Sequence, residues 1–98
     1  MNTISGAKLE KYFLITEKAL AAAKKAPVKK DHKQDVAVIL DMVERYVSDA
    51  HHFEKTGDKV LAFAALNYAH GWLDCGARLG LFVVNDSTLF TVDNGCLE

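Results

Sequence analysis

The chain has 98 residues, of which 50% are hydrophobic and 26% are charged, and its formal net charge is −1. This length allows one domain, and this composition is typical of a folded globular protein and not of a disordered one. No run approaches the roughly 20 apolar residues that cross a bilayer, and the N-terminus lacks a signal-peptide pattern. We therefore expect a cytoplasmic protein with no membrane partner.

The charges are unevenly distributed along the chain. Residues 1–33 carry eight lysines against three acids, whereas residues 34–98 carry four cations against ten acids. Opposite charges can attract each other within one bundle or between two copies. The alternative is a surface for nucleic acid or another acidic partner.

A first helix is predicted over residues 5–25, because its apolar residues recur on one helical face. They are Leu9, Tyr12, Phe13, Thr16, Ala19, Leu20 and Ala23. The helix must end before Pro27, which breaks helices. A solvated basic connection follows and offers a weak nucleic-acid signal, since no aromatic or arginine is interleaved with its lysines. These lysines are Lys24, Lys25, Lys29, Lys30 and Lys33.

A second helix is predicted over residues 34–56 from an apolar stripe at three- and four-residue spacing. The stripe consists of Val36, Ile39, Leu40, Val43, Tyr46, Val47, Ala50 and Phe53. Gly57 can adopt the left-handed conformation that closes a helix, and Asp58 can cap the next one. This indicates a tight turn and two antiparallel helices.

The third helix, residues 58–80, is apolar over most of its circumference and is expected to be the most buried. Tyr68 and Trp72 are interpreted as core anchors, and Cys75 as a buried thiol. Small residues in this helix indicate close packing: Ala62, Ala65, Ala69 and Gly76. Gly80 is expected to end this helix.

The tail, residues 81–98, contains two short β-rich runs around Asn85–Thr88. It is expected to be extended or hairpin-like, covering the end of the bundle, lying along it, or pairing with a second copy. Cys75 and the tail residue Cys96 are both expected to be free thiols, because two cysteines make no disulfide framework. The predicted fold is an all-α, three-helix up-and-down bundle in a single domain.

Residues 46–82 carry a series of motifs: D-A-x-x-F, G-D, A-F-A, N-Y-A-x-G-W-L-D and R-L-G-L-F. In these the chain resembles the archaeal domain-of-unknown-function 357 family. The resemblance implies a small helical protein and carries no catalytic assignment. The basic connection and the tail lie outside its best-matching part.

Four polar residues of the third helix project within about 80° of one another: Asn67, His70, Asp74 and Arg78. We call them the polar stripe. One interpretation is a solvent face with contacts between residues four apart. The other is a binding groove, in which Asp74 orients His70 or Arg78 and the second helix contributes Arg45, Asp49 and His52.

Two narrower hypotheses use the same histidines. His70 and Asp74 are spaced to share a metal ion, with Asp49, His51 or His52 as further ligands, but no zinc motif accompanies them. The spacing of Arg45 and His51-His52 resembles the HEPN superfamily of helical nucleases and nucleotide-binding proteins, although Arg45 and His51 point about 240° apart on a helix.

No catalytic residue, metal site or cofactor is assigned from the sequence, and an enzyme is not expected, because no nucleophile has a visible activating partner. The preferred hypothesis is a protein–protein interaction module. It would form a homo-oligomer through the first helix or residues 81–92, or dock on a larger protein. The alternative is a ligand- or RNA-binding domain of HEPN type that uses the polar stripe.

Overall fold

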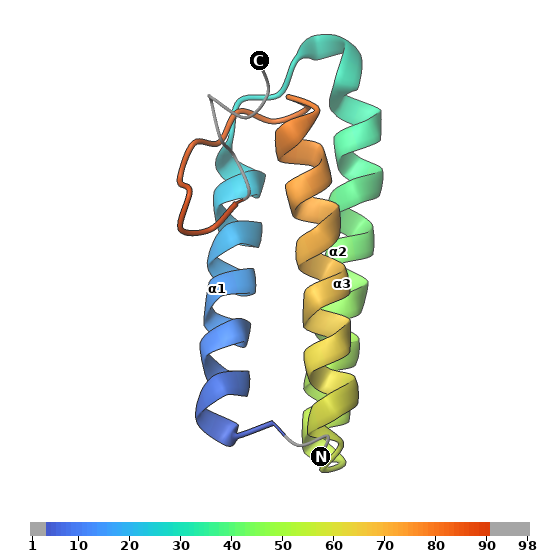
Figure 1. The fold of residues 1–98 in the computed structure, drawn as a ribbon. Coiled ribbons are helices and arrows are strands. Elements are labelled where there is room, and N and C mark those ends of the chain that lie inside the picture. Colours follow the sequence, from blue (N-terminus) through green and yellow to red (C-terminus); the bar gives the residue numbers. More distant parts are fainter. Residues whose placement is uncertain (1–3, 91–98) are drawn as a thin grey trace.

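The structure is a computed structural model that describes residues 4–90. It contains the helices α1 (Gly6–Lys25), α2 (Lys33–Lys55) and α3 (Lys59–Arg78), with a short 3-10 turn, η1 (Lys30–His32), before α2. Figure 1 shows α1 running up, α2 down and α3 up, so that the start of α1 lies at the same end as the α2–α3 turn. The predicted three-helix up-and-down bundle is confirmed.

Local signals explain where the helices begin and end. Ser5 caps α1 by accepting a hydrogen bond from the Lys8 backbone N–H at 3.1 Å, and Ala26, which precedes Pro27, is already extended. Gly57 has a φ of 85° and closes α2, with the Asp58 N–H bonded to the Phe53 carbonyl at 2.8 Å.

Asp58 both ends that turn and begins α3. Its carboxylate accepts from the Leu61 backbone N–H at 3.1 Å. At the far end of α3, Gly80 has a φ of 72° and Leu81 N–H reaches the Gly76 carbonyl at 3.0 Å. The predicted roles of Gly57, Asp58 and Gly80 are therefore confirmed.

The core changes character along the bundle. Near the α2–α3 turn, large side chains of α1 fill the interior, and this part contains Leu9, Phe13, Ala50, Ala62, Ala65 and Leu66. At the other end α1 presents alanines, and the space is occupied by rings from the tail. This part contains Ala19, Ala23, Val36, Ile39, Val43, Val47, Ala69, Leu73, Phe82 and Phe90. The tail therefore completes the core.

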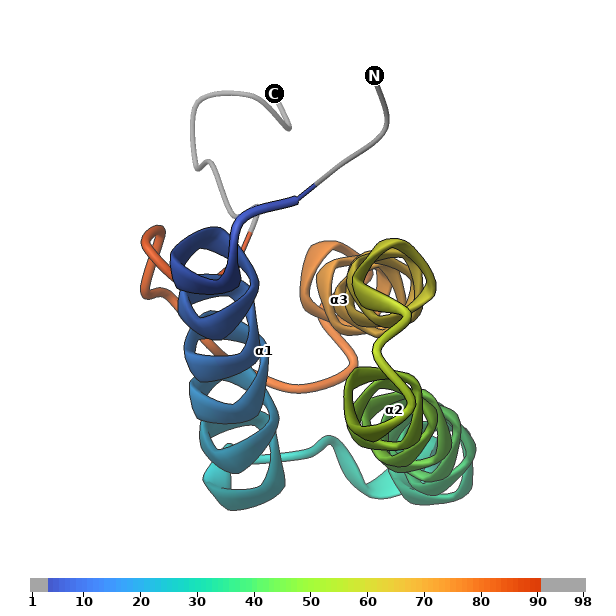
Figure 2. The same cartoon turned by 90° about the horizontal axis from the view of Figure 1, so that it is seen from below.

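The tail crosses from the end of α3 to α1, as Figures 1 and 2 both show. Phe82 pairs with Val28 in an isolated antiparallel bridge, and the Val83 N–H bonds to the Pro27 carbonyl at 3.0 Å. The tail forms a turn at residues 86–90 but no hairpin within the described part of the chain. Residues 91–98, which include Cys96 and the end of the second β-rich run, lie outside the described residues.

Gly76 shows why a small residue is needed under the tail. A methyl group at this position would lie 2.8 Å from ring carbon Cζ of Phe82 and 3.4 Å from Cδ1 of Ile39. The expected close packing at Gly76 is thus real, and the group that packs there is a tail ring.

Two predictions for α3 were wrong. Tyr68 is 54% exposed and is not a core anchor, and Cys75 is exposed and not buried. The reason is geometric: α3 has neighbours on two sides only, so an apolar side chain on its third side faces solvent. Trp72 is half-buried and packs against the core, as expected of an anchor.

Candidate functional site

The polar stripe of α3 faces α1 and the tail. His70 is half-buried, with Nε2 2.5 Å from the Leu89 carbonyl oxygen and Nδ1 3.2 Å from Thr16 Oγ1. Thr16 is the buried polar residue of α1, and its hydroxyl finds its partner here. Both nitrogens of His70 are therefore engaged within the protein.

Asp74 stands beside this histidine. Its Oδ1 lies 3.8 Å from His70 Nε2, and the two side chains are 26% and 20% exposed. This distance is too long for a hydrogen bond. The i,i+4 relationship expected from the sequence is present, but the stronger bonds of His70 go elsewhere.

The stripe borders a small hollow between α1 and α3. Its volume is about 220 Å³, and it is lined by Tyr12, Ile15, Asn67, His70, Gly71 and Asp74. Asn67 is exposed, and Arg78, at the last position of α3, is exposed as well. Three members of the stripe thus meet in one hollow, whose other wall comes from α1.

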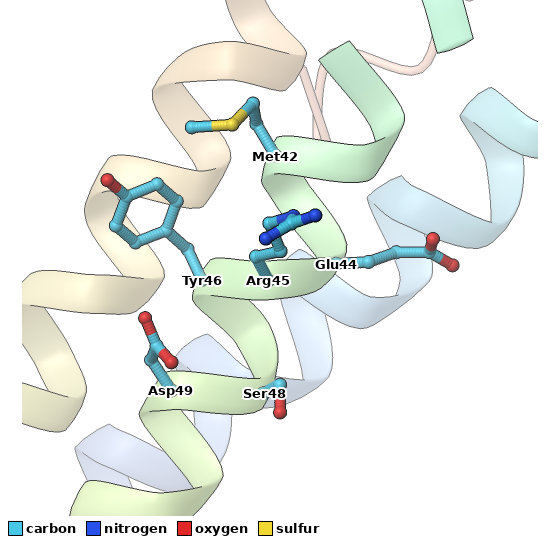
Figure 3. A pocket seen from close by; sticks show the side chains of 6 residues that line it. All are labelled: Met42, Glu44, Arg45, Tyr46, Ser48 and Asp49. Carbon is cyan, nitrogen blue, oxygen red and sulfur yellow. The ribbon is translucent and has the colours of Figure 1, made fainter. Parts of the chain in front are cut away.

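The α2 candidates border a different hollow, shown in Figure 3. It measures about 470 Å³ and is lined by Met42, Glu44, Arg45, Tyr46, Ser48 and Asp49. Arg45 Nε bonds to Asp41 Oδ2 at 2.9 Å on its own helix, while Glu44 points toward α1 and pairs with Lys24. Arg45 and Asp49 therefore share a hollow with each other but not with His70 or Asp74.

The two adjacent histidines of α2 differ in their surroundings. His51 stacks on Phe13 with ring centroids 4.4 Å apart, and its Nε2 lies 2.9 Å from Glu17 Oε2. His52 is exposed, near the ring of Phe53. His51 is thus turned to α1, whereas Arg45 is bonded along the outer surface of α2.

The structure offers no metal cluster in its described range: within residues 4–90, no three His, Cys, Asp or Glu side chains are placed to hold one ion. None of the helices in that same range has the length and apolar content to cross a bilayer. The five lysines of the basic connection are all exposed, and the ammonium of Lys24 is paired with Glu44.

One surface was missed by the sequence reasoning. Exposed or half-exposed apolar residues follow one side of α3 and continue onto α2. We call this surface the outer face and define it by Val38, Met42 and Tyr46 of α2, with Leu61, Ala64, Tyr68, Gly71, Trp72, Cys75 and Leu79 of α3. Part of this recurrence was visible in the sequence of α3, but Tyr68 and Trp72 were interpreted as core anchors and Cys75 as a buried thiol.

Aromatic rings join the two helices at the centre of the outer face. Tyr46 and Tyr68 meet edge to face with centroids 4.5 Å apart, and Tyr68 and Trp72 lie 6.4 Å apart. Beside them is a hollow of about 300 Å³ lined by Asn67, Tyr68, Gly71, Trp72 and Cys75. None of the residues that line this hollow is charged.

Comparison with known proteins identifies the family. The family model described as "Protein of unknown function (DUF357)" matches residues 11–82, which is well over half of the chain. No curated protein and no solved structure matches the chain. The matched range spans most of α1, all of α2 and α3, and the tail as far as Phe82. The chain therefore belongs to the DUF357 family.

Proposed function

We propose that the protein is a small interaction module whose outer face binds a second copy of the same chain. The observation that carries this proposal is the exposure of large apolar side chains together on one surface. Leu61 is 46%, Tyr68 54%, Leu79 67% and Val38 55% exposed. A contiguous apolar patch of this kind is typical of a protein–protein contact.

The outer face replaces the surfaces first expected from the sequence. The rings of Phe82 and Phe90 are buried in this chain's own core, and α1 buries its apolar stripe against the other helices. On those elements, Leu14 and Val83 are the large apolar side chains that are more than half exposed within the described residues. Val83 lines a smaller hollow, of about 230 Å³, between α1 and the tail.

The size of the outer face suits a modest dimer. A 20-residue helix is about 30 Å long, and a surface two helices wide measures about 20 Å across. Two copies would bury about 600 Å² each, or about 1,200 Å² together, which is the lower end for specific interfaces. Area alone does not set affinity, and we propose a micromolar Kd, at the weak end of the range for specific interfaces.

The absence of charge at its centre also favours a protein partner. None of the ten residues that define the outer face is charged, and interface centres are depleted of charged residues. Nucleic acid would require cations there. Cys75 is a free, exposed thiol on this face, which is consistent with action in a reducing cytoplasm.

Gly71→Lys tests the proposal. A side chain at position 71 meets no atom within 4 Å, so the monomer accommodates it, and replacing a helical glycine favours the helix by up to about 1 kcal/mol. At about 100 µM, above a micromolar Kd, light scattering should give a dimer mass for the natural protein and a monomer mass for Gly71→Lys.

The matched control is Ala21→Lys, which adds the same charge at an exposed position on α1. This variant should keep the dimer mass. A monomer mass for the natural protein at about 100 µM would overturn the proposal, as would a dimer that Gly71→Lys leaves intact.

A further inference from the structure

We infer that the two copies pack α3 against α3 in antiparallel orientation, about a two-fold axis at the level of His70. This inference rests on the proposed function and adds to it the register of the contact. It follows from the order of residues along the exposed side of α3, from the hollow at its centre, and from the missing side chain at Gly71.

The exposed side of α3 has nearly the same order of side-chain types in both directions. Its seven residues lie within about 100° of arc on a regular helix. They pair as Leu61 with Leu79, Ala64 with Cys75, and Tyr68 with Trp72, and every pair is centred within half a residue of position 70. A two-fold contact requires such self-complementarity, because the same surface of each copy contributes to the interface and each residue must fit the residue that it faces in the partner.

In this register each type of side chain meets its own kind. Leu61 faces the partner's Leu79, the small Ala64 faces the partner's Cys75, and the aromatic Tyr68 faces the partner's Trp72. Small pairs alternate with large ones along the helix, so the two α3 backbones can approach closely at the small pairs that lie between the large ones. A parallel arrangement, with the axis along the helices, would instead set each residue against its own copy, Leu79 against Leu79 and Tyr68 against Tyr68.

The hollow at the centre fits one particular side chain. Four of its lining residues, Tyr68, Gly71, Trp72 and Cys75, occupy positions i, i+3, i+4 and i+7 of α3. Four residues so spaced form the hole that receives a knob from a facing helix. The middle of this hole lies between Gly71 and Trp72, and the residue opposite it in a register centred on position 70 is the partner's Tyr68.

Tyr68 has the properties of such a knob. It is 54% exposed, and it rests edge-on against Tyr46 at 4.5 Å and against Trp72 at 6.4 Å, so its ring is held by its own chain before any partner arrives. Rigid aromatic side chains of this kind lose little entropy on binding and are common binding hot spots. The two-fold axis makes the insertion reciprocal.

Gly71 lies nearest to the axis and has no Cβ. Because a side chain there would stand in open space in the monomer, the monomer itself gives no packing reason for glycine at this position. Glycine inside a helix costs up to about 1 kcal/mol relative to alanine. Close approach of two α3 backbones at the axis accounts for it.

A cysteine cross-link tests the register. In a Cys96→Ser background, Ala64→Cys places a new thiol opposite the partner's Cys75. Within one chain the two positions are eleven residues apart, about 16 Å along α3, which is too far for a disulfide. Under air oxidation, with dissolved oxygen as the oxidant, we expect a covalent dimer whose peptide map joins position 64 to position 75.

Two controls use the same background. Cys96→Ser alone should stay uncross-linked, because the two Cys75 thiols would lie about 15 Å apart along the antiparallel helices. Ala21→Cys, at an exposed position of α1, should give no disulfide to Cys75. Light scattering on the unoxidised samples reports in parallel whether a dimer is present at all.

The outcomes separate the two proposals. A non-covalent dimer with the 64-to-75 link supports both. A non-covalent dimer in which Cys75 joins Cys75, or in which the 64-to-75 link does not form, overturns the antiparallel register and leaves self-association standing. A monomer in light scattering at about 100 µM overturns both proposals.

Discussion

His70 Nε2 lies 2.5 Å from the carbonyl oxygen of Leu89, so a residue that the sequence marks as a candidate ligand instead holds the tail. A carbonyl oxygen only accepts, so Nε2 donates, and Nδ1 of the neutral ring then accepts from the Thr16 hydroxyl 3.2 Å away. One side chain thereby ties α3 both to α1 and to the segment that closes the core. This use of both nitrogens leaves no ring nitrogen for an ion or substrate.

Thr16→Val should therefore destabilise the protein while keeping its shape. The methyl group replaces a buried hydroxyl of the same size and leaves Nδ1 of His70 without its donor, which costs about 1–3 kcal/mol. Urea unfolding followed by circular dichroism measures the loss. Ser48→Ala, which removes an exposed hydroxyl from α2, is the control and should change stability by less than about 0.5 kcal/mol. Equal midpoints for the two variants would contradict this role of His70.

Gly76→Ala and Gly71→Ala should move stability in opposite directions. At position 76 the new methyl meets the Phe82 ring, and overpacking of a core costs about 1–3 kcal/mol. At position 71 the methyl meets nothing, and the gain in helix propensity is up to about 1 kcal/mol. Thermal unfolding at a protein concentration below the Kd of the dimer, where the monomer predominates, compares the two. A stabilising Gly76→Ala would show that the ring of Phe82 does not pack on α3.

Phe90→Ala should be among the most damaging changes in the tail. Its ring is 3% exposed and lies 6.3 Å from that of Phe82 in the core next to the alanines of α1. Removing a buried phenylalanine costs about 3–5 kcal/mol through lost burial and the cavity that remains. Val83→Ala, at a 59% exposed position, should be close to neutral. Chemical denaturation of both variants gives the comparison, and a mild Phe90→Ala would place the ring outside the core.

The turn at Asp86 should respond to acid. Hydrogen bonds from the Thr88 hydroxyl and backbone N–H hold the pKa of the Asp86 carboxyl below its ordinary value of 3.8. A lowered folded-state pKa means that the ionised form stabilises the turn. This contribution is fully present above pH 3.8 and is lost as the pH falls through the lower, folded-state pKa.

Nuclear magnetic resonance can follow this titration at the Thr88 amide. Its chemical shift should move with a midpoint below pH 3.8 in the natural protein. In Asp86→Asn the same signal should show no such transition, because the titrating group is gone. A midpoint at or above the ordinary carboxyl value would contradict the bonds to Thr88.

Signals confined to a few neighbouring residues were sufficient to predict the secondary structure and the topology. Pro27 ended α1 because its ring cannot continue a helix, Gly57 closed α2 with a positive φ, and Asp58 capped α3. These effects act within one helical turn, so they need no tertiary information. The apolar stripes of α1 and α2 were also interpreted correctly, because each of these helices has one clear buried face.

The candidate site could not be predicted in this way, because contacts between residues far apart in the sequence determine it. Whether His70 binds a ligand or the tail depends on where Leu89 returns, nineteen residues later in the chain. Likewise, apolar residues surround most of α3, and only the placement of α1, α2 and the tail left Tyr68 in solvent while burying Leu73. Helix formation is governed by contacts a few residues apart, whereas the exposure of a side chain is set by which distant segments pack over it.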